Sequence, residues 1–247
     1  MSRARRGNFG GVGREIDRCL AELHRLQRLG HAKIPVATAA GASAIVAGLG
    51  NGVVLLGRRW CEEEWITLIA VPVIGVAGMS LLRRRGWSWR DLGFRPLVVQ
   101  SSARLASALV LAATCLAAVS GVVAFLSREL TALEVVRTLV GTAVGEEIVH
   151  RSVVLAAWVD TRLRAGWVVA ANMITFAVWH VAGANAGRFS WIEVIGPGLL
   201  ALPLLWARLR FHSVLAPAAF HGAANLTGSL LATGSAELRF GHCVTGR

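Results

Sequence analysis

Long apolar blocks separated by short polar loops dominate this 247-residue chain. The apolar blocks lie at about 34–56, 65–82, 103–126, 136–158, 165–182, 191–206 and 213–233. All but the 191–206 block are about 18 to 24 residues long, which is the length of a helix that crosses the hydrocarbon core of a bilayer. The pattern therefore predicts an all-α fold, a polytopic transmembrane helix bundle of about seven spans, or eight.

Two blocks contain prolines that are expected to disturb a regular helix. The 191–206 block is short and contains Pro197 and Pro203, so we expect a tilted, broken or re-entrant segment there. Pro217 lies one turn before His221 and should kink the last helix.

A basic segment at 1–33 precedes the apolar blocks. Residues 1–13 are rich in Gly and Arg and are expected to be disordered. Residues 14–29 place apolar side chains at helical spacing among Arg and Glu, which predicts an amphipathic helix that lies on the membrane surface or contacts a partner helix. The chain is thus divided into this segment, a transmembrane domain at 34–233 and a tail at 234–247.

Composition supports a membrane protein over a large soluble helical protein. Hydrophobic residues make up 55% of the chain and charged residues 16%, against about 25% charged residues in soluble domains. The net charge of +12 would suggest nucleic acid as a partner of a soluble protein. Here the arginines cluster in loops between apolar blocks, so we exclude nucleic acid and expect the bilayer and its anionic lipids as partners.

The distribution of Lys and Arg predicts the orientation of a multi-pass cell-membrane protein. With the N-terminus in the cytoplasm and seven crossings, inside segments hold 18 Lys and Arg and outside segments hold 6. This bias follows the positive-inside rule. One span more or fewer would move the C-terminus to the other side.

Charged and polar residues lie inside three of the apolar blocks. They form three groups: Glu146, Glu147 and Arg151; Phe176 and His180; His221 and Asn225. An ionisable group at bilayer depth costs roughly 2.5–3.5 kcal/mol even on a lenient scale, so such groups indicate a functional site by default. These residue types favour hydrolysis.

The spacing of the first group predicts a division of roles. Glu147 and Arg151 are four residues apart on a helix and can pair. Glu146 points about 100° away around the helix, next to His150 one turn on, so its carboxylate remains available as a general base or acid.

Two chemistries fit the three groups. In one, a Glu and a His activate water while a His and an Asn donate hydrogen bonds to the oxyanion of a peptide carbonyl. In the other, Glu and His residues ligate a divalent metal that activates the water. Spacing does not separate these two, although the four scattered cysteines exclude a thiolate zinc site.

The motifs EEIVHR at 146–151, FAVWH at 176–180 and HGAAN at 221–225 resemble those of the CAAX protease and bacteriocin-processing (CPBP, or Abi) family. The best-known relative is the CAAX prenyl endopeptidase of the endoplasmic reticulum. The resemblance covers about 135–230, and two softer features also fit, RDLGF at 90–94 and a small-residue-rich segment with a basic turn at 196–213.

The resemblance implies a membrane endopeptidase whose active site lies within the bilayer. Carried over by motif position, Glu146 is the water-activating carboxylate and His180 assists it. His221 and Asn225 then stabilise the oxyanion. The substrate is a membrane-associated or lipidated peptide or protein.

The remaining motif residues, Glu147 and Arg151, would support this geometry. The family has been described both as metalloproteases and as metal-independent glutamate proteases. We favour the metal-independent form, with no cofactor, because a Glu and a His suffice to polarise water. If a metal such as zinc is used, its ligands would be Glu146, His180 and His221.

Two other functions remain open from the sequence. One is a non-proteolytic membrane protein of the same fold, for bacteriocin self-immunity or as a scaffold. The other is a small transporter, which should show an inverted repeat or paired broken helices, and neither is visible. The expected spans also place His180 near one membrane surface and Glu146 nearer mid-depth, so their meeting requires a shifted or tilted 165–182 helix.

Overall fold

A computed structural model describes residues 9–29, 33–60, 63–95, 131–184 and 190–232, and all regular structure within them is helical. The elements are α1 (Phe9–Leu29), α2 (Val36–Trp60), α3 (Glu63–Arg84), α5 (Ala132–Val136), η2 (Arg137–Val144), α6 (Gly145–Ile148), η3 (Val149–Val154), α7 (Leu155–Val159), α8 (Ala165–Trp179), α9 (Val181–Ala184), α10 (Trp191–Phe211) and α11 (Leu215–Ala232).

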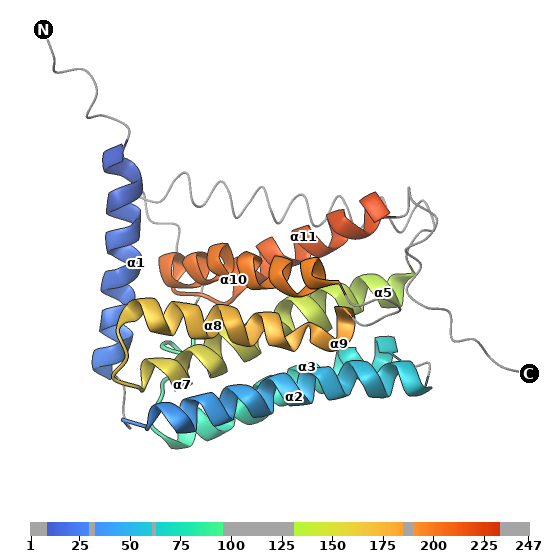
Figure 1. Cartoon of the computed structure of the whole chain (residues 1–247), viewed down its shortest axis with the longest axis horizontal. Coiled ribbons are helices and arrows are strands. Elements are labelled where there is room, and N and C mark those ends of the chain that lie inside the picture. Colours follow the sequence, from blue (N-terminus) through green and yellow to red (C-terminus); the bar gives the residue numbers. More distant parts are fainter. Residues whose placement is uncertain (1–8, 30–32, 61–62, 96–130, 185–189, 233–247) are drawn as a thin grey trace, which may run out of the picture.

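The long helices lie along a common direction, and α1 lies across one end of them (Figure 1). Within the described residues, three helical stretches are long and apolar enough to cross a membrane: Val36–Arg59, Trp65–Arg84 and Trp191–Phe211. Together with the all-helical architecture, they make this a helical membrane bundle. The expected span at 103–126 and the tail at 234–247 lie outside the described residues.

The amphipathic helix α1 packs one face against the bundle. Leu23 and Leu26 are buried, whereas Ile16 and Leu20 on the same helix are exposed. A helix that lies across the ends of spanning helices and exposes apolar side chains suits the membrane interface. This helix begins at Phe9, so residues 9–13, which we expected to be disordered, are helical instead.

Residues 132–159 form one continuous helical rod in which two π-helical stretches, η2 and η3, flank the short α6. The paired glutamates lie in α6 between these wider turns. Such π turns occur mostly at functional sites, where they change the direction of side chains relative to a regular helix.

Glycines allow this rod to approach α3 closely. A Cβ atom on Gly141 would lie 2.9 Å from the Cα atom of Leu68, and one on Gly75 would lie 2.8 Å from the side chain of Ile148. Small residues at helix contacts let the backbones approach, which is a common packing device in membrane bundles. The glycines of both helices therefore fix the position of α6 against α3.

Both prolines of α10 lie inside an unbroken 21-residue helix, contrary to our expectation of a short or broken segment. The helix continues to Phe211 because its polar last turn is held in place: Arg208 donates to the backbone carbonyls of Asp91 (2.6 Å) and Arg151 (3.2 Å). Pro217 lies in the first turn of α11, where a missing N–H is tolerated, so it is not placed to kink the helix mid-way before His221.

The RDLGF segment forms part of the turn after α3 and joins the rod to α10 and α11. The hydroxyl of Ser152 donates to the carbonyl of Leu92 (2.6 Å), and the amide of Val214 donates to the carbonyl of Gly93 (3.0 Å). Gly93 has φ of +97°, and a Cβ there would lie 2.6 Å from Nε of Arg208. Only glycine fits this turn without strain.

The close contact at Gly141 predicts a stability defect on substitution. Gly141→Ala should lower the free energy of unfolding by about 1–3 kcal/mol, because the new methyl group meets backbone atoms that cannot move aside. Thermal unfolding of the purified chain in detergent would measure the effect. Gly52→Ala in α2, where a Cβ meets only open space, is the matched control and should be neutral or stabilising; equal effects of the two changes would contradict the packing argument.

Candidate active site

Three helices bring the polar motif residues together. The rod supplies Glu146 and Glu147 from α6 and Arg151 from η3, α8 ends next to His180, and α11 carries His221. All of these are buried except His180, whose side chain is 24% exposed. The site is thus enclosed, with His180 at its most accessible edge.

Glu147 is held by two partners. Its Oε2 lies 3.1 Å from Nε of Arg151, the pair that the spacing predicts, and its Oε1 lies 3.0 Å from Nδ1 of His221. Arg151 also donates from Nη1 to Oδ1 of Asn172, whose side-chain amide donates to the carbonyl of His150 (3.0 Å). The charge of Glu147 is therefore used to join the rod to α11.

Glu146 is placed differently from its neighbour. Its Oε2 lies 3.7 Å from Nε2 of His180 and 4.0 Å from Nε2 of His221, and it has no hydrogen-bond partner among the described residues. These separations are too long for direct hydrogen bonds. A polar contact at such a distance is commonly closed by a bridging water.

The hydrogen bond of His180 indicates which of its two ring nitrogens carries the proton. Nδ1 lies 2.7 Å from the carbonyl oxygen of Phe176. Because a carbonyl only accepts hydrogen bonds, Nδ1 carries the proton, and Nε2 of the neutral ring is an acceptor. His180 therefore presents a basic nitrogen towards the carboxylate of Glu146.

Phe176 forms the apolar floor of the cluster. Its buried ring lies 4.7 Å from the ring of His180 and 5.7 Å from that of His221, measured between centroids, and the guanidinium carbon of Arg151 lies 5.0 Å from it. The ring excludes water from one side and adds a cation–π contact to the buried Arg151.

Two further polar residues, His150 and Asn225, lie next to the motif residues. His150, one turn from Glu146, has its ring against Phe176 and Trp179 (4.8 and 5.1 Å between centroids), and neither ring nitrogen has a hydrogen-bond partner among the described residues. Asn225 is partly buried and follows His221 by one turn of α11, which puts the two residues on one helical face.

The end of α8 accounts for the meeting of His180 with Glu146. The helix ends at Trp179, three residues earlier than expected, and His180 caps it with φ of −91° and ψ of 0°. A side chain at a helix end can turn towards a neighbouring helix, and here it contacts the middle of the rod.

The arrangement does not match a preformed metal site. Two ligands of a tetrahedral zinc ion, each about 2.0–2.1 Å from the metal, lie about 3.3 Å apart, which is less than the 3.7 and 4.0 Å found from Glu146 to the two histidines. Within the described ranges, no group of three or more His, Cys, Asp or Glu side chains is placed to hold a metal ion.

Asn172 is a member of the cluster that the motifs did not reveal. It lies four residues before Phe176 and eight before His180, so all three share one face of α8. The only signal in the sequence was an amide in an apolar helix, in register with a candidate histidine, and the structure shows that this amide is fully buried.

Residues 128–227 match the family model described as type II CAAX prenyl endopeptidase Rce1-like, and the matched segment contains every residue of the cluster. This segment is therefore similar to the CAAX protease family. No curated protein and no solved structure matches the chain. The apolar helices make the chain a membrane protein, and the polar cluster lies inside the segment that is similar to this protease family.

The buried pair of Glu147 and Arg151 predicts non-additive effects on stability. Arg151→Leu leaves the carboxylate of Glu147 without its guanidinium and should lower the free energy of unfolding by about 3–5 kcal/mol. The double variant Glu147→Gln with Arg151→Leu should recover part of this loss, because no buried charge remains unpaired.

Thermal unfolding of the single and double variants in detergent would measure the coupling. Arg59→Gln, a change at an exposed arginine of α2, is the control and should alter stability little. A double variant at least as unstable as the sum of its single changes would contradict the ion-pair interpretation.

Proposed function

We propose that this protein is an intramembrane endopeptidase that hydrolyses a peptide bond in a membrane-associated or lipidated peptide or protein. The observation that carries the proposal is the environment of Glu146. Its buried Oε2 has no hydrogen-bond partner among the described residues and lies 3.7 and 4.0 Å from the Nε2 atoms of His180 and His221. Its neighbour Glu147 is already occupied by Arg151 and His221.

In this mechanism a water molecule binds beside Glu146 and His180 and contacts both side chains. The carboxylate of Glu146 accepts one proton as the water oxygen attacks the carbonyl carbon of the substrate, while Nε2 of His180 accepts a hydrogen bond from the other proton. The proton held by Glu146 then passes to the leaving amine as the C–N bond breaks. The products are a carboxylic acid, which keeps the second proton of the water until it ionises in solvent, and an amine. Glu146 returns to its starting state.

His221 and Asn225 would stabilise the tetrahedral oxyanion. With Nδ1–H of His221 bound to Glu147, Nε2 becomes a donor in the imidazolium form and lies on the side of Glu146. The amide of Asn225, one turn along α11, supplies a second donor. Arg151 would hold Glu147, and Glu147 would in turn hold the ring of His221.

The surroundings support a substrate that enters from the bilayer. The spanning helices expose many large apolar side chains, among them Ile69 and Val73 of α3 and Ile192 and Leu199 of α10. The family description names a prenyl endopeptidase, which is consistent with a lipid-bearing substrate here. We place the N-terminus in the cytoplasm, because with that orientation the inside segments carry the larger share of the Lys and Arg residues.

Removal of the proposed base should abolish cleavage without loss of the fold. Glu146→Gln and His180→Ala should each lower the rate by about a hundredfold or more, since general-base assistance is worth about 10²–10⁴. Purified protein in lipid would be mixed with a defined pool of lipidated peptides, and products would be identified by mass spectrometry. Glu193→Gln, at an exposed glutamate of α10, should retain the wild-type rate. Normal cleavage by Glu146→Gln would refute the assignment and favour a binding-only role.

The same assay distinguishes the two ways of activating water. If Glu146 and His180 act directly, cleavage should persist after treatment with a strong chelator and dialysis. Loss of cleavage with the chelator, followed by recovery on addition of zinc, would contradict the metal-independent mechanism and make Glu146, His180 and His221 the metal ligands.

A further inference from the structure

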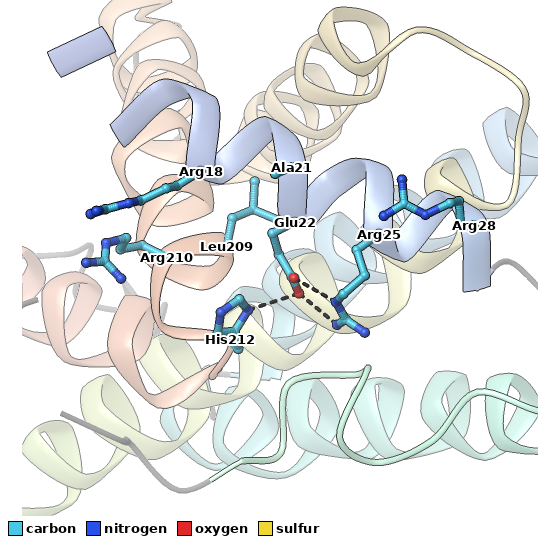
Figure 2. Close-up of a pocket in the computed structure, with 8 residues that line it drawn as sticks. All are labelled: Arg18, Ala21, Glu22, Arg25, Arg28, Leu209, Arg210 and His212. Atoms are coloured by element: carbon cyan, nitrogen blue, oxygen red, sulfur yellow. Dashed lines mark hydrogen bonds and ion pairs between the residues drawn. The ribbon is translucent and has the colours of Figure 1, made fainter. Parts of the chain in front are cut away.

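A cleft of about 440 Å³ lies between α1 and the C-terminal end of α10 (Figure 2), and none of the residues that line it belongs to the buried cluster. Its volume lies within the range of small-molecule sites. Eight residues line it: Arg18, Ala21, Glu22, Arg25, Arg28, Leu209, Arg210 and His212. The lining is thus strongly basic, with one carboxylate among four guanidinium groups.

That carboxylate is already engaged. Glu22 accepts two hydrogen bonds from Arg25, at 2.7 and 2.8 Å, and its Oε1 lies 3.0 Å from Nδ1 of His212. Burial acts to raise the pKa of Glu22, but the hydrogen bonds from Arg25 and His212 outweigh it and lower the pKa to about 2. Arg25 also reaches Asp91 at 3.2 Å, so these groups form a closed network.

The other arginines of the cleft are less well compensated. Arg18 and Arg210 share a single carboxylate, that of Glu15, at 2.6 and 2.8 Å. Arg28 is exposed, and no carboxylate of the described chain pairs with it. The cleft therefore holds an excess of positive charge on planar groups that suit a phosphate.

The backbone at the end of α10 shapes one side of the cleft. His212 has φ of +55° and ψ of 21°, and it is the one non-glycine residue with positive φ among the residues that the structure describes. A left-handed residue commonly ends a helix, and His adopts this conformation more often than most residues do. Here the turn directs the imidazole towards Glu22 in the cleft.

The location selects the kind of ligand. The helix α1 lies across the ends of the spanning helices (Figure 1), and it exposes Ile16 and Leu20. A helix of this kind lies at the level of the lipid head groups. A phosphate of a membrane lipid would thus lie at the height of the cleft, and free phosphate could reach it from the water.

We propose that the cleft between α1 and α10 binds an anionic phosphate group, supplied by a lipid head group or by free phosphate. Arg18 and Arg28, which lie at the two ends of the cleft (Figure 2), provide positive charge that attracts the phosphate. This site is independent of the proposed peptidase chemistry. Its occupation would hold α1 against the last turn of α10, which also carries Arg208 and so contacts the backbone of Arg151 in the buried cluster.

The test is a ligand titration of the thermal unfolding midpoint of the full chain in neutral detergent. The probes are short-chain phosphatidylglycerol, phosphatidylcholine with the same chains, and inorganic phosphate. A ligand that binds only the folded state raises the midpoint. We expect phosphatidylglycerol to raise it more than phosphatidylcholine, and Arg18→Gln with Arg28→Gln to require about tenfold more phosphatidylglycerol for the same rise.

The matched control is Arg14→Gln with Arg84→Gln, which removes the same charge from exposed arginines of α1 and α3 outside the cleft. It should titrate like the wild type. An equal rise with inorganic phosphate that is lost in the cleft variant assigns the free anion, whereas a rise with phosphatidylglycerol alone assigns the lipid. No rise with either ligand, or equal weakening in both double variants, would overturn the proposal. If the double variant does not fold, Arg28→Gln alone serves the same purpose, because Arg28 has no ion pair in the described chain.

Discussion

The buried carboxylate of Glu147 is the group on which the arrangement of the site depends. An unpaired charge inside an apolar bundle is strongly unfavourable, so Glu147 must be met by Arg151 and His221. These two contacts tie α11 to the rod, and the bond from Arg151 to Asn172 adds α8. The neutralisation of one charge thus brings together the three helices that carry the proposed catalytic groups.

The same last turn of α10 contributes to two separate parts of the molecule. Arg208 reaches inward to the backbone of Arg151 and to the turn after α3, while Arg210 points to Glu15 of α1. Because these residues are two positions apart, any displacement of this turn would change the contacts of α10 with both the surface helix α1 and the rod. The RDLGF turn packs against Arg208 in this last turn of α10. This contact gives a structural reason for its glycine, Gly93, and for its buried leucine, Leu92.

Much of this organisation could be predicted from the sequence. Block lengths gave the helices α2, α3 and α8 to within a few residues, and the four-residue spacing gave the pair of Glu147 and Arg151. The features that could not be predicted from the sequence are those that depend on contacts between helices. The full length of α10 depends on carbonyl partners in distant segments, and the early end of α8 is visible only in the backbone. Asn172 was missed because a single amide in an apolar helix carries little signal until its partner is known.

The wider turns in the rod have a consequence for how this helix could change. A π turn holds one more residue than the α turn that it replaces, so η2 and η3 act as local surpluses of chain on either side of α6. Loss of one residue from either stretch would convert the π turn to an α turn and would rotate one part of the rod relative to the other. The glutamate pair would then turn away from the two imidazoles, although every residue of the motifs would still be present. The alignment of the site is therefore encoded in the count of residues around the motif as much as in the motif itself.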